Sequence, residues 1–138
     1  MASRPTPRRN AFTLIELLIV LAIAGILAAV AMPSFVQHVR KGRRSDAHEA
    51  AAAVMQAQER WRSNRTKYSD TLEPLGVSGT SKGGYYRLEL SAASGIGYTL
   101  RLTAVEGKSQ AKDTGCTALT VTVTGGAPSY GEPACWSR

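Results

Sequence analysis

The sequence predicts an α+β fold in which one long N-terminal helix packs on a small antiparallel β-sheet. An apolar stretch and an amphipathic repeat follow each other from Phe12 to about residue 63 with no turn signal between them, which predicts a single helix. Three short stretches after residue 84 alternate apolar and polar residues, which is typical of strands with one buried face. With 138 residues, the chain is long enough for one domain.

Residues 1–11 form a polar leader that contains two prolines and three arginines, and no packed element is expected there. These arginines contribute to the formal net charge of +7, so the rest of the chain has only a modest excess of basic residues. Such an excess permits nucleic acid or anionic lipid as a partner but requires neither.

The next segment, from Phe12 to Val36, is apolar apart from Glu16 as its one charged residue. As a helix it would be about 38 Å long, which is enough to cross a bilayer with some tilt. A cleaved secretory signal peptide is the alternative, with small residues around Ala31 available for the cut. The length of the apolar run and the carboxylate near its start favour a retained membrane helix.

The amphipathic half of the helix is expected to end near Ser63. Its apolar residues fall on one stripe, formed by Val36, Val39, Ala47, Ala50, Val54, Ala57 and Trp61. Arg43 falls within the same stripe, so we expect the helix to stand clear of the head at that level and to pack on something else. Pro33 is expected to kink or loosen the helix.

The predicted strands follow a loop at residues 64–84 that is rich in turn-forming residues. They cover about residues 85–90, 98–104 and 119–124, and they fit an antiparallel meander with one face on the helix. The tail at residues 125–138 is rich in Gly and Pro, so we expect it to have little structure of its own.

Cys116 and Cys135 are the two cysteines of the chain, and a disulfide that closes the C-terminal loop is the favoured interpretation. Two buried free thiols are the alternative. A metal site is not expected, because the histidines, His38 and His48, lie far from the cysteines on the predicted helix. A disulfide requires an oxidising compartment, which places the leader in the cytoplasm and the head in the periplasm.

The segment from Ala11 to Leu17, AFTLIEL, resembles the class III signal of type IV pilins and type II secretion pseudopilins. The resemblance implies a pilin-like fold, cleavage by a prepilin peptidase between Ala11 and Phe12, and methylation of the new amine of Phe12. The residue before the cut is usually glycine in that family, whereas this chain has Ala11. Three later features look like the small minor pilins of type IV pili: Tyr85-Tyr86, Asp113-Thr114-Gly115-Cys116 and Cys135-Trp136.

Glu16 is the residue to which the resemblance gives a role in assembly. A carboxylate in hydrocarbon is costly unless it is protonated or paired. Cleavage before Phe12 would create an amine one helical turn from Glu16. The same amine of a neighbouring subunit would then neutralise Glu16 and fix the axial register of the packed helices. The alternative is a hydrated glutamate at the membrane interface, without a role.

The expected organisation is a cleaved leader at residues 1–11, a transmembrane and filament-core helix at residues 12–36, and a periplasmic or surface head at residues 37–138. The expected function is that of a structural subunit, a minor pilin, of a type IV pilus. Expected partners are other pilin subunits, prepilin peptidase, the assembly machinery of the inner membrane and, before assembly, the lipid of that membrane. After assembly the subunit would lie in an extracellular pilus.

The alternatives are a DNA-binding or adhesive pilin and a type II secretion pseudopilin. Arg87 and Arg101 are the candidates for a DNA patch, because they can align on the polar faces of adjacent strands. We expect binding to DNA to be weak, about 10⁻⁴–10⁻⁶ M at physiological salt, and without sequence preference. The denser basic group from Arg40 to Arg44 is expected to contact lipid phosphates. No enzyme active site, cofactor or metal is expected.

Overall fold

The computed structural model describes residues 12–137 and has the α+β fold that the sequence predicts. The leader, with Ala11, lies outside the described residues. The elements, in which η marks a 3-10 helix, are α1 (Leu14–Arg62), η1 (Glu73–Leu75), β1 (Tyr86–Ser91), β2 (Gly97–Ala104), η2 (Ser109–Lys112), β3 (Ala118–Thr124), β4 (Ala127–Tyr130) and α2 (Pro133–Trp136). The structure divides into two compact units, one ending at Val36 and the other beginning at Gln37.

The first unit contains the apolar part of α1. The side-chain oxygen of Thr13 accepts a hydrogen bond from the backbone N–H of Glu16 at 3.3 Å, so Thr13 caps the helix and α1 begins just after it, at Leu14. The helix continues through Pro33 as a single element. Every side chain from Phe12 to Val36 is exposed within this unit.

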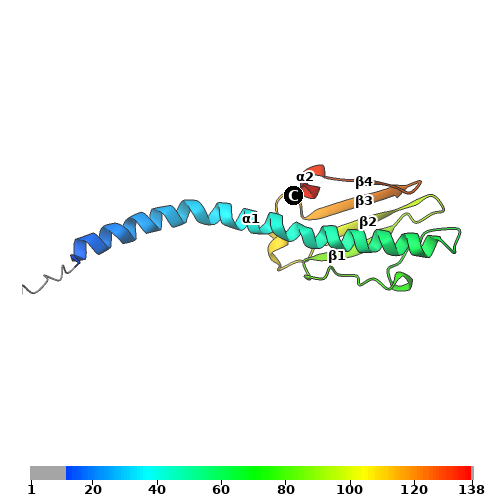
Figure 1. Cartoon of the computed structure of the whole chain (residues 1–138), viewed down its shortest axis with the longest axis horizontal. Helices are drawn as coiled ribbons and strands as arrows, with labels where there is room; N and C mark the ends of the chain where they lie inside the picture. The colour runs from blue at the N-terminus through cyan, green and yellow to red at the C-terminus, as the bar shows by residue number, and fades with distance from the viewer. Residues whose placement is uncertain (1–11, 138) are drawn as a thin grey trace, which may run out of the picture. The chain divides into compact units, whose positions relative to one another are not determined.

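In the second unit, α1 runs along one face of the sheet (Figure 1). The buried side chains of α1 follow one helix face and are Ala47, Ala51, Val54, Ala57 and Gln58. The predicted stripe is confirmed at Ala47, Val54 and Ala57. Trp61 is only partly buried, because its ring lies under the guanidinium of Arg65, 3.4 Å away, and not in the core.

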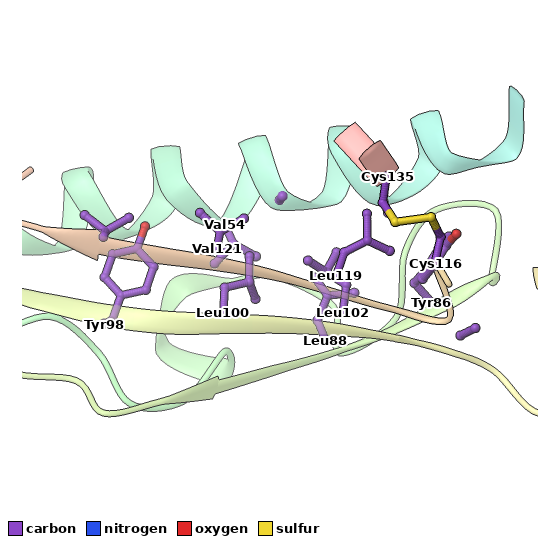
Figure 2. Packing of buried hydrophobic residues seen from close by; sticks show 14 of the residues in the cluster. Val54, Tyr86, Leu88, Tyr98, Leu100, Leu102, Cys116, Leu119, Val121 and Cys135 are labelled. Atoms are coloured by element: carbon purple, nitrogen blue, oxygen red, sulfur yellow. A yellow bond between two sulfur atoms is a disulfide. The ribbon is translucent and has the colours of Figure 1, made fainter. Parts of the chain in front are cut away.

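The sheet is an antiparallel meander with the strand order β1-β2-β3-β4. The alternation predicted for the first three strands is confirmed, with bounds that differ from the expected ones by one residue at one or both ends. The buried side chains of these strands include Tyr86, Leu88, Tyr98, Leu100, Leu102, Leu119, Val121 and Val123. Figure 2 shows them as a row between the sheet and α1, from Tyr98 at one end to the disulfide at the other.

The expectation of an unstructured tail is wrong, because β4 pairs with β3 and α2 follows it. Gly125 and Gly126 form the turn between these strands with φ angles of 59° and 80°, a combination that suits a two-residue hairpin. β4 is exposed at the edge of the sheet and contains Pro128, so it lacks the alternating burial that reveals a strand in a sequence. Its pairing with β3 is what makes it a strand.

The loop between α1 and β1 is fixed to the helix by one buried side chain. Gln58 donates a hydrogen bond from Nε2 to the carbonyl of Ser69 at 2.7 Å and accepts one from the N–H of Ser69 at 2.9 Å. Gln58 is fully buried, so the backbone of Ser69 satisfies both halves of its amide. Tyr68 adds a hydrogen bond from its hydroxyl to Glu59 at 3.1 Å. These contacts hold an irregular loop against the end of α1.

Candidate functional site

The exposed apolar part of α1 is the first candidate feature. By length and composition, α1 is the one helix among the described residues that is long and apolar enough to cross a membrane, with a mean hydropathy of 2.8 over an 18-residue stretch. Phe12 and Leu17 are 79% and 55% exposed, and Glu16 is an exposed acidic residue of the first turn. The segment therefore presents one carboxylate on an apolar surface, and such a surface requires a covering partner.

Cys116 and Cys135 form the expected disulfide, with their Cα atoms 5.6 Å apart. Cys116 lies just before β3 and Cys135 lies in α2, so the bond ties the C-terminal segment to the sheet (Figure 2). Both sulfur-bearing residues are buried in the core of the head.

Aromatic side chains also hold α2 on α1. The ring of Trp136 stacks on the ring of His48, with centroids 5.0 Å apart and an angle of 18°, and Tyr130 lies 4.8 Å from the same indole. The Nε2 atom of His48 is 3.1 Å from the carbonyl oxygen of Cys135. His48 therefore has a packing role. Among residues 12–137, no group of three or more His, Cys, Asp and Glu side chains is placed to hold a metal ion.

The basic residues at the start of the head turn toward the connection between β2 and β3. Arg40 donates a hydrogen bond to the carbonyl of Lys112 at 3.0 Å, and Arg43 donates one to the hydroxyl of Ser109. The guanidinium of Arg43 also lies over the ring of Tyr85, 5.0 Å from its centroid. The expectation that the helix stands clear of the head at Arg43 is therefore wrong. The connection returns to this level of α1, and no local pattern in the sequence reveals that return.

Arg44 pairs with a buried carboxylate in the same connection. Its Nε lies 2.8 Å from Oδ2 of Asp113 and its Nη2 lies 2.9 Å from Oδ1, and Asp113 is 1% exposed. The hydrogen bond to Asp113 raises the pKa of Arg44 above its ordinary value. Gln110, fully buried beside this pair, donates to the carbonyl of Arg40 at 3.2 Å and to the hydroxyl of Tyr86 at 2.9 Å. We call Arg40, Arg43 and Arg44, with their partners in residues 109–113, the arginine latch.

Arg87 and Arg101 lie exposed on the outer face of β1 and β2. Arg101 is directly opposite Glu89 and Arg87 is directly opposite Thr103, so the two arginines are diagonal neighbours on one face. Glu89 and Glu106 line a surface hollow together with Arg87. Two carboxylates thus share this surface with the two guanidinium groups, and they weaken its attraction for phosphate.

A second exposed basic group, which was not expected from the sequence, lies where α1 ends. Arg60, Arg65 and Lys67 are exposed, and the guanidinium of Arg65 covers the ring of Trp61. We call these four residues the tip group. Its signal in the sequence is a tryptophan surrounded by basic residues with only small polar residues between them. An exposed basic and aromatic surface of this kind suits contact with a nucleic-acid strand.

Two family models match the chain. Residues 33–120 match the model described as "Type IV minor pilin ComP, DNA uptake sequence receptor". The chain belongs to the type IV pilin family. Residues 6–32 of this pilin match a second model, described as "Prokaryotic N-terminal methylation motif". The two matches together run from the leader to the start of β3, so the pilin resemblance does not depend on the N-terminal signal alone.

The pilin is also similar to pilins and fimbrial proteins of several bacteria. The type IV major pilin protein PilA of Myxococcus xanthus (strain DK1622) is 41% identical over 93 residues, which are 67% of this chain and 42% of PilA. Fimbrial protein EcpC of Eikenella corrodens is 32% identical over 95 residues, 69% of this chain and 62% of EcpC. The type IV major pilin protein PilE1 of Neisseria gonorrhoeae is 33% identical over 90 residues, 64% of this chain and 54% of PilE1. The chain therefore spans about half the length of these relatives.

A pilin that has an N-terminal methylation motif and an exposed apolar N-terminal helix fits a membrane-anchored precursor that later becomes part of an extracellular pilus. The relatives are pilins and fimbrial proteins by name.

Proposed function

We propose that this pilin is a minor structural subunit of a type IV pilus that polymerises through residues 12–36. The observation that carries the proposal is the exposed apolar part of α1 with Glu16 in its first turn, followed by a small disulfide-bonded head. Packing of many such helices side by side would cover the apolar surface. The description of the matched model as a minor pilin supports the minor role, whereas several relatives are named major pilins.

In this proposal, residues 1–11 are a leader that prepilin peptidase removes between Ala11 and Phe12, and the new amine of Phe12 is methylated. Residues 37–138 form the head. The match to the methylation motif supports this division. The disulfide supports a topology with the leader in the cytoplasm and the head in the periplasm before the assembly machinery extracts the subunit.

Glu16 is the residue that we assign to assembly. It lies in the first turn of α1, about one turn from Phe12, and no other residue from Phe12 to Val36 is charged. A methylated amine of a neighbouring subunit would neutralise this carboxylate in the filament core, where an unpaired charge is costly.

Mass spectrometry of sheared filaments tests the proposal. The expected result is a mature chain that begins with methylated Phe12 and is present at a small fraction of the most abundant pilin. A chain cut near Ala31, or absent from filaments but present in the medium, would indicate an ordinary secreted protein. A chain that is the most abundant pilin of the filament would be a major pilin. That result would contradict the minor role but not the role as a pilus subunit.

DNA binding is a second candidate function, favoured by one observation. The family model that matches residues 33–120 is described as a DNA uptake sequence receptor. Two surfaces of this head are candidates: Arg87 and Arg101 on the sheet, and the tip group. The tip group is the better candidate by charge, because it has three basic residues and only Asp70 shares the hollow that Arg65 and Lys67 line, whereas Glu89 and Glu106 share the surface of Arg87 and Arg101.

A titration of a short DNA duplex with the full-length chain in detergent, across a salt series, tests this function. The slope of log K against log salt falls by about 0.9 for each phosphate contact that is lost. Two double variants are compared. One carries Arg65→Ala and Lys67→Ala, and the other carries Arg87→Ala and Arg101→Ala, so each loses two positive charges. Loss of affinity and slope in the first pair alone assigns binding to the tip group, and loss in the second pair alone assigns it to the sheet. Equal affinity in all variants would mean that neither surface binds DNA.

A further inference from the structure

Thr13 fixes the position at which α1 begins. Its side-chain oxygen accepts a hydrogen bond from the N–H of Glu16 at 3.3 Å, and its carbonyl accepts one from the N–H of Leu17 at 3.3 Å. These are the two bonds that an N-cap residue makes, and Thr13 and Glu16 have the spacing of a capping box. Phe12 and Thr13 accordingly lie outside the helix, which begins at Leu14.

The position of the cap matters for the peptide bond between Ala11 and Phe12, which prepilin peptidase cuts in the proposed function. In this hydrolysis, water adds to the carbonyl carbon of Ala11 and the C–N bond breaks. The products are a carboxyl group on the leader and an amine on Phe12. A carbonyl within a helix accepts a hydrogen bond from the N–H four residues later and is enclosed by the helical turn, so catalytic groups cannot approach it freely. The peptidase therefore needs a helix that starts after this bond.

Without the cap at Thr13, the sequence favours a longer helix. Asn10 is the next residue toward the N-terminus of a type that caps helices well, and Ala11 is a strong helix former. A helix that started after Asn10 would bond the carbonyl of Ala11 to the N–H of Ile15. The carbonyl that water must attack would then be withheld from the peptidase.

We infer that Thr13 is a positioning residue for maturation, which stops α1 short of Phe12 so that prepilin peptidase can bind the bond between Ala11 and Phe12 in an extended form. The model described as an N-terminal methylation motif matches residues 6–32, so the matched segment includes both the bond and the cap. The inference rests on the cleavage in the proposed function and adds a residue that controls access to the bond.

Cleavage of the full-length chain by a purified prepilin peptidase in detergent tests the inference. If the peptidase binds only the fraction of the substrate that has the shorter helix, loss of the cap raises KM and leaves kcat unchanged. Thr13→Ala is expected to raise KM about three- to fivefold, because loss of a threonine N-cap shifts a helix equilibrium by about fivefold. Thr13→Ser keeps a capping oxygen and should be cleaved like the parent.

Two further variants separate capping from direct recognition of the hydroxyl. Thr13→Asn introduces a side chain that caps helices at least as well but has no hydroxyl, so KM should stay near the parental value. Thr13→Val keeps the shape without the oxygen and should raise KM. Amide hydrogen exchange, measured by NMR on the full-length chain, gives a readout that does not involve the peptidase. The N–H of Ile15 should exchange more slowly in Thr13→Ala than in the parent, because it gains the carbonyl of Ala11 as a partner.

An unchanged KM in Thr13→Ala and Thr13→Val would overturn the inference. A raised KM in Thr13→Asn with a parental KM in Thr13→Ser would also overturn it, because the peptidase would then recognise the hydroxyl itself. A parent chain that the peptidase does not cut, or cuts elsewhere than between Ala11 and Phe12, would contradict the proposed function instead. That result differs from correct cleavage that is indifferent to the cap.

Discussion

The guanidinium of Arg44 donates two hydrogen bonds to the carboxylate of Asp113, which lies 69 positions later in the chain. The pair joins the start of the head's helix to the connection between β2 and β3. Because Asp113 is 1% exposed, removal of the arginine would leave a buried carboxylate without a partner.

Arg44→Met is therefore expected to lower the free energy of unfolding of the head by about 3–5 kcal/mol. Chemical denaturation followed by near-ultraviolet circular dichroism measures it. Arg60→Met makes the same change at an exposed position of the same helix and should alter stability by less than about 0.5 kcal/mol. Similar effects of the two substitutions would mean that the ion pair with Asp113 does not stabilise the head more than an exposed arginine does.

Two buried tyrosines should respond in opposite ways to loss of the hydroxyl. Within the described residues, the hydroxyl of Tyr98 is buried and has no hydrogen-bond partner, whereas that of Tyr86 accepts from Gln110 at 2.9 Å. Tyr98→Phe should leave the free energy of unfolding unchanged or raise it by up to about 1 kcal/mol, and Tyr86→Phe should lower it by about 1 kcal/mol. Denaturant titrations of both variants at neutral pH make the comparison, and the reverse order would contradict it.

The same tyrosines predict a loss of stability at alkaline pH. Burial raises the pKa of Tyr98 and of Tyr86 in the folded head above the ordinary value of about 10. The folded state therefore holds these protons more tightly than the unfolded state, so this contribution is complete below about pH 10 and is lost as pH rises toward the folded values. Stability measured from neutral to strongly alkaline pH should fall more steeply for the parent than for Tyr98→Phe. Parallel curves would show that the ionisation of Tyr98 does not contribute to the decline.

Loss of the disulfide should release the C-terminal segment. Replacing Cys116 and Cys135 together by serine is expected to cost about 2–5 kcal/mol. The stacking of Trp136 on His48 should weaken at the same time, because α2 loses its covalent attachment. Limited proteolysis followed by mass spectrometry tests this, with the Arg60→Met variant as an intact control. A tail that stays resistant to protease without the bond would mean that aromatic packing alone holds α2.

Glu16→Ala should leave the subunit in the membrane but impair its assembly. Removal of the charge makes membrane insertion easier by about 2.5 kcal/mol or more, so loss of membrane stability cannot explain an assembly defect. The ratio of variant to parent in sheared filaments, from cells that express both, measures the effect. Glu16→Gln keeps the shape without the charge and should show the same defect. Incorporation of either variant at the parental level would refute the proposed role of Glu16.

The periodicity of apolar residues predicted the helix and the strands that bury one face. It did not predict the segments whose structure depends on contacts with residues distant in sequence. The strands around Leu100 and Val121 bury one sheet face, so apolar and polar residues alternate in their sequence. β4 is exposed and shows no such alternation, and it is a strand because it pairs with β3. The expectation for Arg43 is wrong for the same reason. Its place on the apolar stripe predicts that the head does not contact the helix there, whereas its guanidinium contacts Ser109 and Tyr85.

The same distinction, between local sequence signals and contacts distant in sequence, applies to the candidate sites. Glu16, the cysteine pair and the surface arginines are marked by residue type alone, so the sequence pointed to them. The burial of Asp113 depends on the return of η2 to α1 beside Arg44, and it is not visible without the three-dimensional arrangement.

The clamp formed by Gln58 and the backbone of Ser69 limits which parts of this loop can vary. Gln58 bonds only the backbone N–H and carbonyl of Ser69, while the buried hydroxyl of Ser69 bonds the backbone of Thr71. Tyr68, just before the clamp, is buried against Tyr98 and is not free to change, whereas exposed loop residues such as Asp70 and Glu73 can change while the attachment to α1 persists. Surface variation can therefore accumulate in this loop during evolution at little cost to folding, and new specificities can arise on a head whose framework stays the same.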